Sequence, residues 1–317
     1  ASPKEEYEVS SITSVADEED WGASSPGTSD VSMVSSETLS DDASSVSISR
    51  SSKKRDRNKL KMVNTMGFIP SAALLVVPDN RGKLDDNYSV SDSVLGAGGF
   101  AVVKKASVRV TNARRAVKII AKSDKNNPGL LKTEIEIMKK LDHPNILTLF
   151  EIFEDDDALS LVLELCQGDQ LEKYVEKHGA LKEVEAAWVL KHVLRAVNYL
   201  HGMSVVHRDI KAANCLLVAK GPLDLQNDVK LSDFGLSCVF KKSTPLTLKC
   251  GTGSHMAPEV FRLNYRESCD LWSVGVMLYF LLATSLPFGK EGLADETAKA
   301  RINFSNSSWV DKSQESV

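Results

Sequence analysis

Apolar and polar positions alternate along this chain in two different periods, and the change of period divides the patterned part into two regions. Short alternating runs, typical of half-buried strands, begin near Tyr88 and recur up to Leu165. One stretch between them, residues 130–141, instead places its apolar residues at helical spacing. The first region is therefore expected to be mostly β-structure with one helix. The expected strands cover residues 88–90, 93–95, 108–110, 116–120, 146–153 and 159–165.

Beyond residue 166 the helical period dominates. Apolar residues recur every three or four positions over 183–201, which is typical of a buried scaffold helix. A second helix is expected over 270–282, apolar on nearly all sides and headed by Asp270. One short strand is expected at 216–218, and residues 229–231 lead to Asp233. The pattern predicts an α+β chain in which a small, mostly β region precedes a larger, mostly helical one.

The first 84 residues lack this patterning. Serine is dense from Ser24 to Ser52, an acidic block occupies residues 17–20, and the charge reverses over the basic stretch 50–61. Such a segment cannot bury enough apolar surface to offset the entropy of ordering. We expect a disordered tail over 1–84 and a folded domain over 88–317. The basic stretch is either a solvated charged run or a patch for a membrane surface, nuclear import or a partner protein.

Composition excludes several classes of protein. The formal net charge of −4 does not favour nucleic acid as a partner. The five cysteines are scattered and lack C-x-x-C spacing, which argues against a disulfide framework or a structural zinc site. No run approaches the roughly 20 apolar residues that span a bilayer, so no transmembrane segment is expected. These features predict a cytoplasmic monomer, with a nuclear or membrane-surface location as the alternative that the basic stretch allows.

Two short polar segments of the second region carry the groups that phosphoryl transfer requires. Asp209, Lys211 and Asn214 lie on the first segment, and Asp233 opens the second. One carboxylate can accept the proton of an attacking hydroxyl, an amide and a second carboxylate can hold magnesium, and the lysine can neutralise charge on the moving phosphate. In order and spacing the two segments resemble the H-R-D-x-K-x-x-N and D-F-G sequences of serine/threonine protein kinases.

This resemblance implies a bilobal protein kinase fold, with a mostly antiparallel β N-lobe over 88–165, a C-lobe over 166–317, and ATP and Mg²⁺ as cofactors. It implies that Asp209 is the catalytic base, that Lys211 stabilises the γ-phosphoryl group, and that Asn214 and Asp233 bind the metal. Lys118 lies within an apolar strand, where an unpaired charge would be costly. In a kinase it would orient the phosphates and pair with Glu134, which faces the apolar side of the expected helix.

The resemblance extends to a nucleotide-binding set. The stretch 95–103 is similar to the kinase G-x-G-x-x-G-x-V turn, with Ala101 in place of the third glycine. Backbone groups of Glu164 and Cys166 would bind the adenine edge, and Leu216 would lie beneath the ring. Gln170 stands where many kinases that prefer basic substrates carry glutamate, so that preference is not implied. The full set is Leu95, Gly96, Ala97, Gly98, Gly99, Phe100, Ala101, Val103, Ala116, Lys118, Glu164, Cys166, Gln170 and Leu216.

The activation segment would run from Gly235 to Ala257-Pro258-Glu259. Thr252 would brace Asp209 and Lys211. Thr244 and Thr247 are alternative phosphorylation sites, and Arg208 would attract a phosphate on either. Met138, Leu149, His207 and Phe234 are expected to form an apolar column that links the lobes. The residues with an expected structural role are His207, Arg208, Phe234, Gly235, Glu259 and Asp270.

Residues 142–146 (D-H-P-N-I), 233–237 (D-F-G-L-S) and 287–288 (P-F) make the resemblance strongest to calcium/calmodulin-dependent and calcium-dependent kinases. This implies transfer to serine or threonine hydroxyls of protein substrates. The sequence holds no EF-hand loop, so calmodulin or another calcium sensor would lie outside this chain. The last C-lobe helices, and an arginine to pair with Glu259, are expected to be missing. The alternative is a pseudokinase or an ATP-binding scaffold without catalysis. Pseudokinases usually lack one of four catalytic residues, but this chain retains all of them: Lys118, Asp209, Asn214 and Asp233.

Overall fold

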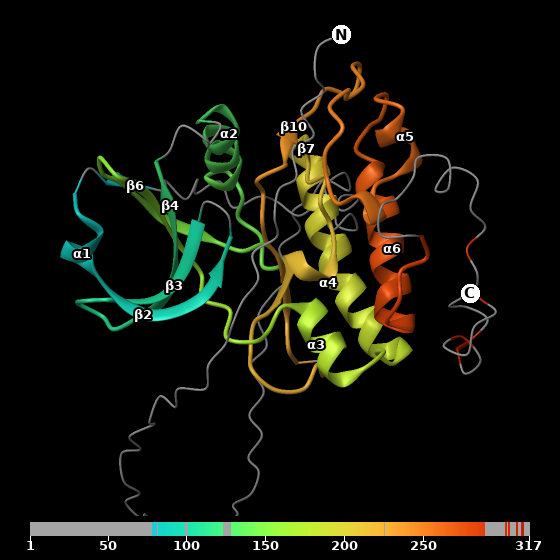
Figure 1. Ribbon diagram of the computed structural model, residues 1–317, viewed down its shortest axis with the longest axis horizontal. Coiled ribbons are helices and arrows are strands. Elements are labelled where there is room, and N and C mark those ends of the chain that lie inside the picture. Colours follow the sequence, from blue (N-terminus) through green and yellow to red (C-terminus); the bar gives the residue numbers. More distant parts are fainter. Residues whose placement is uncertain are drawn as a thin grey trace, which may run out of the picture. The chain divides into compact units, whose positions relative to one another are not determined.

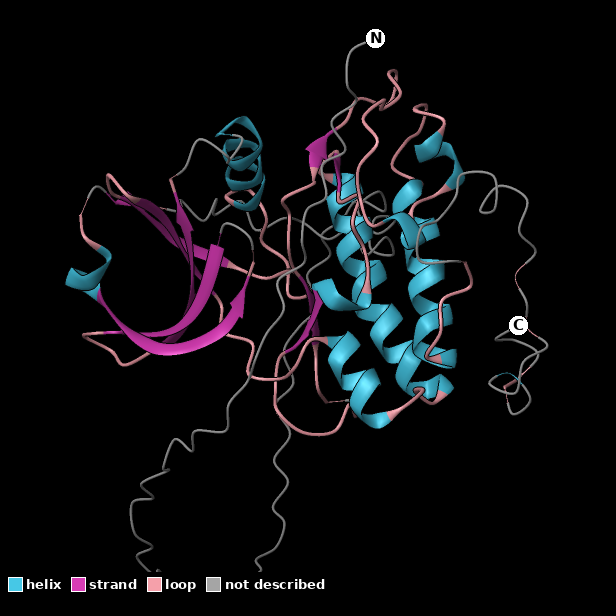
Figure 2. Cartoon of the chain, in the orientation of Figure 1, coloured by secondary structure: helices cyan, strands magenta, loops and turns pink. Residues whose placement is uncertain are grey.

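The computed structural model describes residues 78–80, 82–98, 101–122, 128–224 and 226–288, together with residues 302, 304, 309, 312 and 313. Nearly all of the predicted tail, including the basic stretch 50–61, lies outside these residues. Within them, the long strands form one sheet and the long helices α4 and α6 pack against each other (Figures 1 and 2).

The sheet has six strands in the order β1-β5-β6-β4-β3-β2. Neighbours are antiparallel except β1 and β5, which are parallel. The strands are β1 (Asp79–Asn80), β2 (Tyr88–Ala97), β3 (Ala101–Val108), β4 (Arg114–Ala121), β5 (Leu149–Glu154) and β6 (Ala158–Leu163). A short helix α1 (Leu84–Asn87) precedes β2, and α2 (Pro128–Met138) follows β4. The predicted region of strands with one long helix is therefore confirmed.

Several details of this region differ from the sequence pattern. β5 begins at Leu149 rather than at residue 146, β6 ends at Leu163 rather than at residue 165, and α2 ends at Met138 rather than at residue 141. The predicted strand at 108–110 is wrong, because β3 ends at Val108 and Val110 is 92% exposed in a turn. That turn is made by Asn112, which has φ 56° and donates from its N–H to the Val108 carbonyl at 2.8 Å. Asn tolerates this left-handed geometry better than most residues. The sheet also begins before Tyr88, since β1 lies within the predicted tail.

The helical region contains α3 (Leu171–His178), α4 (Glu183–Gly202), α5 (Pro258–Phe261) and α6 (Cys269–Ala283). The two helices predicted at 183–201 and 270–282 are confirmed to within one residue at each end. Two short ladders complete it, β7 (Val205–Val206) with β10 (Cys238–Val239) and β8 (Cys215–Leu217) with β9 (Val229–Leu231). Two 3-10 turns cover Ala212–Asn214 and Gly253–His255. The chain has the bilobal protein kinase fold.

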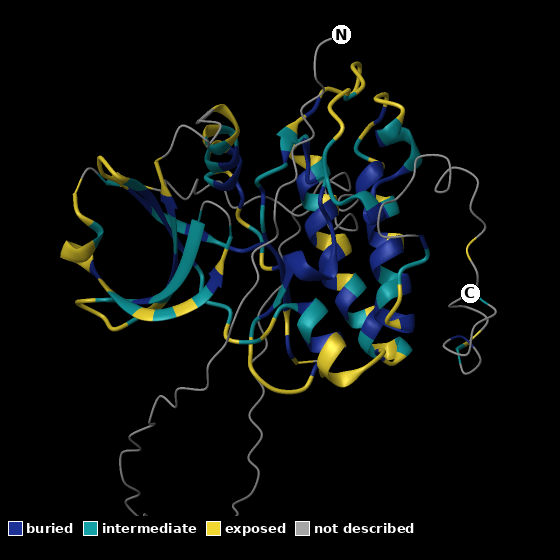
Figure 3. Ribbon diagram, in the orientation of Figure 1, coloured by how far each residue is buried: buried dark blue, intermediate teal, exposed yellow. Residues whose placement is uncertain are grey.

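One buried apolar cluster runs from the sheet through α2 to α4 and α6. Figure 3 shows the buried positions along the inner faces of these helices. Met138, Leu149 and Phe234 belong to this cluster, and the rings of His207 and Phe234 meet edge-on at 5.1 Å between centroids. These positions agree with the predicted apolar column. No helix in the described part of the chain is long and apolar enough to cross a membrane.

Candidate active site

Lys118 and Glu134 form an ion pair between the sheet and α2. Lys118 lies on β4, and its Nζ is 2.8 Å from Oε1 of Glu134 on α2. Their side chains are only 15% and 8% exposed. Burial alone would lower the pKa of Lys118, but the negative charges of Glu134 and Asp233 outweigh it and raise that pKa, so the lysine is charged. The predicted pairing is confirmed, and the neighbouring acid Glu136 is exposed.

Asp270, at the start of α6, holds the backbone of the loop that carries Asp209. The Asp270 carboxylate accepts hydrogen bonds from the backbone N–H groups of His207 at 2.9 Å and Arg208 at 2.8 Å. It also lies 2.8 Å from Nε2 of His201 on α4. Asp270 is 0% exposed, so these three contacts replace its water shell. The helix core thereby sets the position of the loop backbone just before Asp209.

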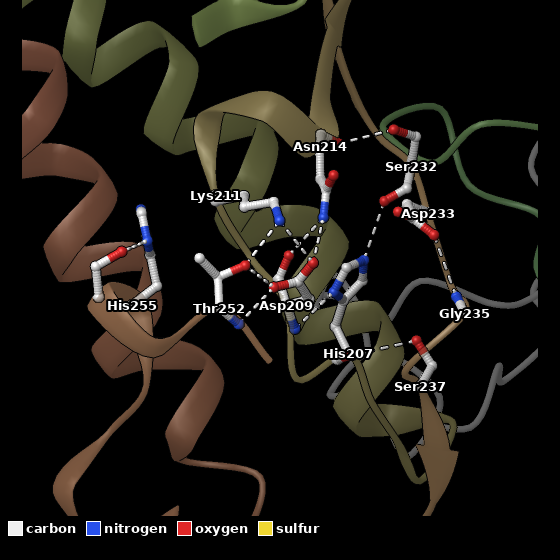
Figure 4. Close-up of polar contacts among 11 residues, drawn as sticks. His207, Asp209, Lys211, Asn214, Ser232, Asp233, Gly235, Ser237, Thr252 and His255 are labelled. Atoms are coloured by element: carbon white, nitrogen blue, oxygen red, sulfur yellow. Dashed lines mark hydrogen bonds and ion pairs between the residues drawn. The ribbon is translucent and has the colours of Figure 1, made fainter. Parts of the chain in front are cut away.

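The Asp209 carboxylate is held on both oxygens (Figure 4). Oδ1 accepts from the N–H and the hydroxyl of Thr252 at 3.0 and 2.7 Å. Oδ2 lies 3.0 Å from Lys211 Nζ and 2.9 Å from Asn214 Nδ2. Burial would raise the pKa of Asp209, but Lys211 and the Thr252 hydroxyl outweigh it and hold that pKa below its ordinary value. Lys211 also donates to the Thr252 hydroxyl at 2.7 Å, so the predicted brace is confirmed.

Asn214 and Asp233 come together because β8 pairs with β9. The N–H and hydroxyl of Ser232 both donate to the Asn214 carbonyl at 2.9 Å, which places Asp233 beside it (Figure 4). The side-chain nitrogen of Asn214 donates to Asp209. The side-chain oxygen of Asn214 has no hydrogen bond among the described residues. Asp233 has φ 63° and accepts one long bond of 3.4 Å from the Gly235 N–H.

These two side chains offer the oxygen donors that Mg²⁺ prefers. The described part of the chain holds no group of three or more His, Cys, Asp or Glu residues suited to a metal. A magnesium ion here would therefore take its other ligands from phosphate oxygens and water, as it commonly does. The donor set fits Mg²⁺ bound together with a nucleotide.

The glycine-rich turn joins β2 to β3. The N–H of Gly98 donates to the Ala101 carbonyl at 2.8 Å and closes this turn. Gly99 and Phe100 lie outside the described residues. Leu95 and Val103 are half-buried against the main apolar cluster, which also contains Ala116 of β4. Gly96 pairs with Val103 and Ala97 with Val102 in the ladder, so the predicted phosphate-facing turn lies at the end of the β2–β3 hairpin, whose register shifts just before Gly96.

The segment after β6 leaves backbone groups unpaired where adenine binding was predicted. The Glu164 carbonyl and the Cys166 N–H have no hydrogen-bond partner among the described residues. Leu216 is half-buried on β8 and forms a bridge with Gln170 at the start of α3. Burial raises the pKa of the Cys166 thiol to about 12, so this thiol stays protonated. Glu164 and Cys166 thus present a hydrogen-bond acceptor and a donor from backbone positions two residues apart.

Two residues of this region were missed by the sequence reasoning. Lys230 of β9 is 2.9 Å from Glu164 Oε2 and donates to the Pro144 carbonyl at 2.7 Å. The Thr148 hydroxyl also donates to Glu164 Oε2, at 3.1 Å. A lysine inside an apolar strand was the available signal, the same one that singled out Lys118. The second missed residue is Tyr265, which contacts Arg208.

The activation segment carries the remaining predicted residues. Thr244 and Thr247 are exposed, and Arg208 binds neither. Arg208 instead donates from Nε to the Leu236 carbonyl at 2.6 Å and from Nη1 to the Tyr265 hydroxyl at 3.3 Å. Glu259 is half-buried at the start of α5, and its carboxylate has no ion pair or hydrogen bond with a described residue.

Comparison with known proteins places this geometry in a family. Residues 89–316 match the protein kinase domain. The chain is 36% identical over 238 residues to calcium-dependent protein kinase 3 of Plasmodium berghei, covering 74% of this chain and 42% of that protein. It is 38% identical over 228 residues to myosin light chain kinase A of Dictyostelium discoideum, and this match covers 70% of this chain and 76% of that protein. The first of these comparisons spans about two fifths of the calcium-dependent kinase. The chain belongs to the protein kinase domain family, with relatives in the calcium-dependent and myosin light chain kinase group.

Proposed function

We propose that this chain is a serine/threonine protein kinase that transfers the γ-phosphoryl group of ATP to protein hydroxyls. The observation that carries the proposal is the arrangement around Asp209. Its carboxylate is held by Thr252, Lys211 and Asn214, while Asp233 lies next to Asn214 and beside the Lys118–Glu134 pair. Burying such charged groups costs folding energy, and perturbed sets of this kind cluster at functional sites. Phosphoryl transfer uses each member of the set.

Each residue then has a defined role. Asp209 accepts the proton of the substrate hydroxyl, and Lys211 neutralises charge on the transferred group. Lys118, oriented by Glu134, binds the phosphates of the nucleotide. Asn214 and Asp233 would hold Mg²⁺, which would supply positive charge to the phosphates. Most of the acceleration would come from positioning and from charges fixed in advance, since the protein itself forms no covalent bond to the phosphate.

The nucleotide base would be read by the backbone after β6. The free Glu164 carbonyl and Cys166 N–H match the donor and acceptor on the edge of adenine. Leu216 and Ala116 would provide apolar surface for the ring, and Gln170 would bind a ribose hydroxyl. The glycine-rich turn of residues 95–103 would cover the phosphates with backbone N–H groups.

Calcium-linked signalling is the setting that we propose. It rests on relatives that are named calcium-dependent protein kinases and a myosin light chain kinase. The calcium sensor would lie outside this chain, as calmodulin or as another protein segment. A cytoplasmic location is consistent with this setting, and protein serine or threonine side chains would be the substrates.

The direct test measures labelled γ-phosphate transfer from Mg·ATP to a peptide library containing Ser, Thr and Tyr acceptors. Parallel reactions contain calcium with calmodulin, or a chelator. We expect transfer to Ser and Thr and little to Tyr. Folded protein that binds Mg·ATP yet transfers nothing would instead be an ATP-binding scaffold. Equal rates with and without calcium and calmodulin would remove the regulatory part of the proposal.

Replacing Lys118 by methionine is expected to lower kcat/KM by about a hundredfold or more, since a fixed charge facing the phosphates is lost. The change also leaves Glu134 buried without a cation. The measurement is steady-state phosphate transfer at varied Mg·ATP. Lys122→Met is the matched control, because Lys122 also pairs with a glutamate, at 2.9 Å, but is 41% exposed. If both variants keep near wild-type kcat/KM, Lys118 does not bind phosphates.

Replacing Lys230 by methionine is expected to raise KM for ATP by about tenfold, through loss of the contacts that hold Glu164. The Glu164 carboxylate and the Pro144 carbonyl would both lose their lysine partner. kcat should change less, because Lys230 does not contact Asp209 or Lys211. Lys220→Met, at an exposed position, serves as the control. An unchanged KM in Lys230→Met would show that this contact does not position the adenine-binding segment.

A further inference from the structure

Tyr265 connects the activation segment to the loop that carries Asp209. Its side chain is 2% exposed. The hydroxyl accepts from Arg208 Nη1 at 3.3 Å and donates to the Leu248 carbonyl at 2.6 Å. The Tyr265 backbone also pairs with Leu246, with N–H to carbonyl bonds of 2.8 and 3.1 Å in the two directions. One residue therefore holds the segment at two neighbouring positions and the Asp209 loop at a third.

The segment fixed in this way leads directly to Thr252. Gly251, which lies between Leu248 and Thr252 in the sequence, has φ 110°, and a Cβ added to it would lie 2.5 Å from the carbonyl oxygen of Arg208. The segment therefore passes tightly over the loop before Thr252 reaches Asp209. Tyr265 holds one end of this short stretch, and the Asp209 carboxylate holds the other. A shift at Leu248 would be transmitted to Thr252, because only a few residues separate them.

The Arg208 side chain is held in place by neutral groups of the protein, without a phosphate. Its guanidinium donates to two neutral oxygens, those of Leu236 and Tyr265. Thr244 and Thr247 are exposed, and neither contacts Arg208. Burial is the main cause that raises the pKa of Tyr265, so the hydroxyl stays neutral and remains a donor to Leu248. The described contacts therefore form a complete hydrogen-bonded link between the segment and the loop.

We propose that Tyr265 is a positioning residue whose hydroxyl holds the activation segment in its active arrangement without phosphorylation of that segment. This inference rests on the proposed kinase function and adds its regulation. Tyr265 acts through Leu248 and Thr252 on Asp209 and does not touch the reacting atoms. Its consequence is that phosphate on Thr244 or Thr247 is not required for activity.

The test compares Tyr265→Phe with wild type, both treated with a phosphatase and checked by mass spectrometry for the absence of phosphate. The ring keeps its place in the apolar cluster that also contains Val206, Met256 and Cys269. The hydroxyl contacts with Arg208, Leu248 and the more distant Cys250 sulfur are lost. kcat should fall about tenfold, since two hydrogen bonds that fix the activation segment and the Asp209 loop disappear, while KM for ATP stays within about twofold. Exchange of the amides at 246–252 with deuterium should become faster.

Tyr174→Phe is the matched control. Tyr174 is 9% exposed, and its hydroxyl accepts from the Leu223 N–H at 2.9 Å, away from the activation segment. This variant should keep kcat and the slow amide exchange at 246–252. A merely structural role for Tyr265 would lower the melting temperature and leave kcat per folded molecule unchanged. That result would overturn the proposal.

The Thr244→Ala/Thr247→Ala variant tests the second consequence independently of Tyr265, even if Tyr265→Phe fails to fold. Its kcat should remain within about twofold of wild type, as expected for changes at exposed positions. A dephosphorylated wild type that is inactive and gains activity on phosphorylation would overturn the proposal. If wild type transfers no phosphate in either state, the proposed function fails. Amide exchange at 246–252 then decides whether Tyr265 holds the segment.

Discussion

Replacing Asp209 by asparagine is expected to lower kcat by about 10²–10⁴-fold, the range that a positioned general base contributes. Asparagine has the same shape, so it can keep a contact with Thr252 through its oxygen. It has no charge, and its amide nitrogen cannot accept from Lys211 or Asn214, which bind Oδ2 at 3.0 and 2.9 Å. The proton acceptor and part of its support are therefore lost together. Steady-state transfer to a serine peptide measures the effect.

KM for ATP should change much less in Asp209→Asn. None of the four contacts of the Asp209 carboxylate involves Lys118 or the backbone after β6. Asp86→Asn, an exposed change on α1, is the control and should leave both constants unaltered. Turnover above about a tenth of wild type in Asp209→Asn would be too high for loss of a general base, and the role would have to be reassigned.

Replacing Asp270 by alanine is expected to destabilise the fold by about 3–5 kcal/mol, the cost of removing one partner from a buried charged network. Asp270 is 0% exposed and is the acceptor for the N–H groups of His207 and Arg208. Alanine would leave these two donors buried without partners, and it would leave His201 without its carboxylate. For a domain of this size the melting temperature should fall by about 10 °C.

Thermal unfolding monitored by circular dichroism provides the measurement. Asp228→Ala is the control, because its carboxylate also contacts a histidine, His192 at 3.1 Å, but is 59% exposed. Because the Asp228 carboxylate stays largely in contact with water, its pairing should contribute about 1 kcal/mol or less, and this variant should melt within a few degrees of wild type. If Asp270→Ala melts as high as Asp228→Ala, the loop is held by other contacts. Folded Asp270→Ala should also have reduced kcat, since the backbone before Asp209 loses its support.

The sequence by itself determined the elements whose pattern is long or whose chemistry is local. The helix at 183–201 repeats its apolar residues over five turns, so neighbouring residues alone specify it. Lys118 and Glu134 could be paired because a buried lysine needs an acid and the next helix offers one on its apolar side. Asp209, Lys211 and Asn214 are close in sequence, so their shared site follows from a short loop.

Only the tertiary structure decided the contacts that join distant segments. Strand β1 has two residues and no pattern of its own, and its pairing with β5 depends on the edge that β5 presents. Lys230 meets Glu164 and Pro144 because β9 passes beside the segment after β6. Tyr265 contacts both Leu248 and Arg208 because the fold brings these three segments, distant in sequence, next to one another. Buried polar groups need hydrogen-bond partners, and tertiary packing determines which groups lie close enough to serve. The periodicity of apolar residues along the chain does not contain that information.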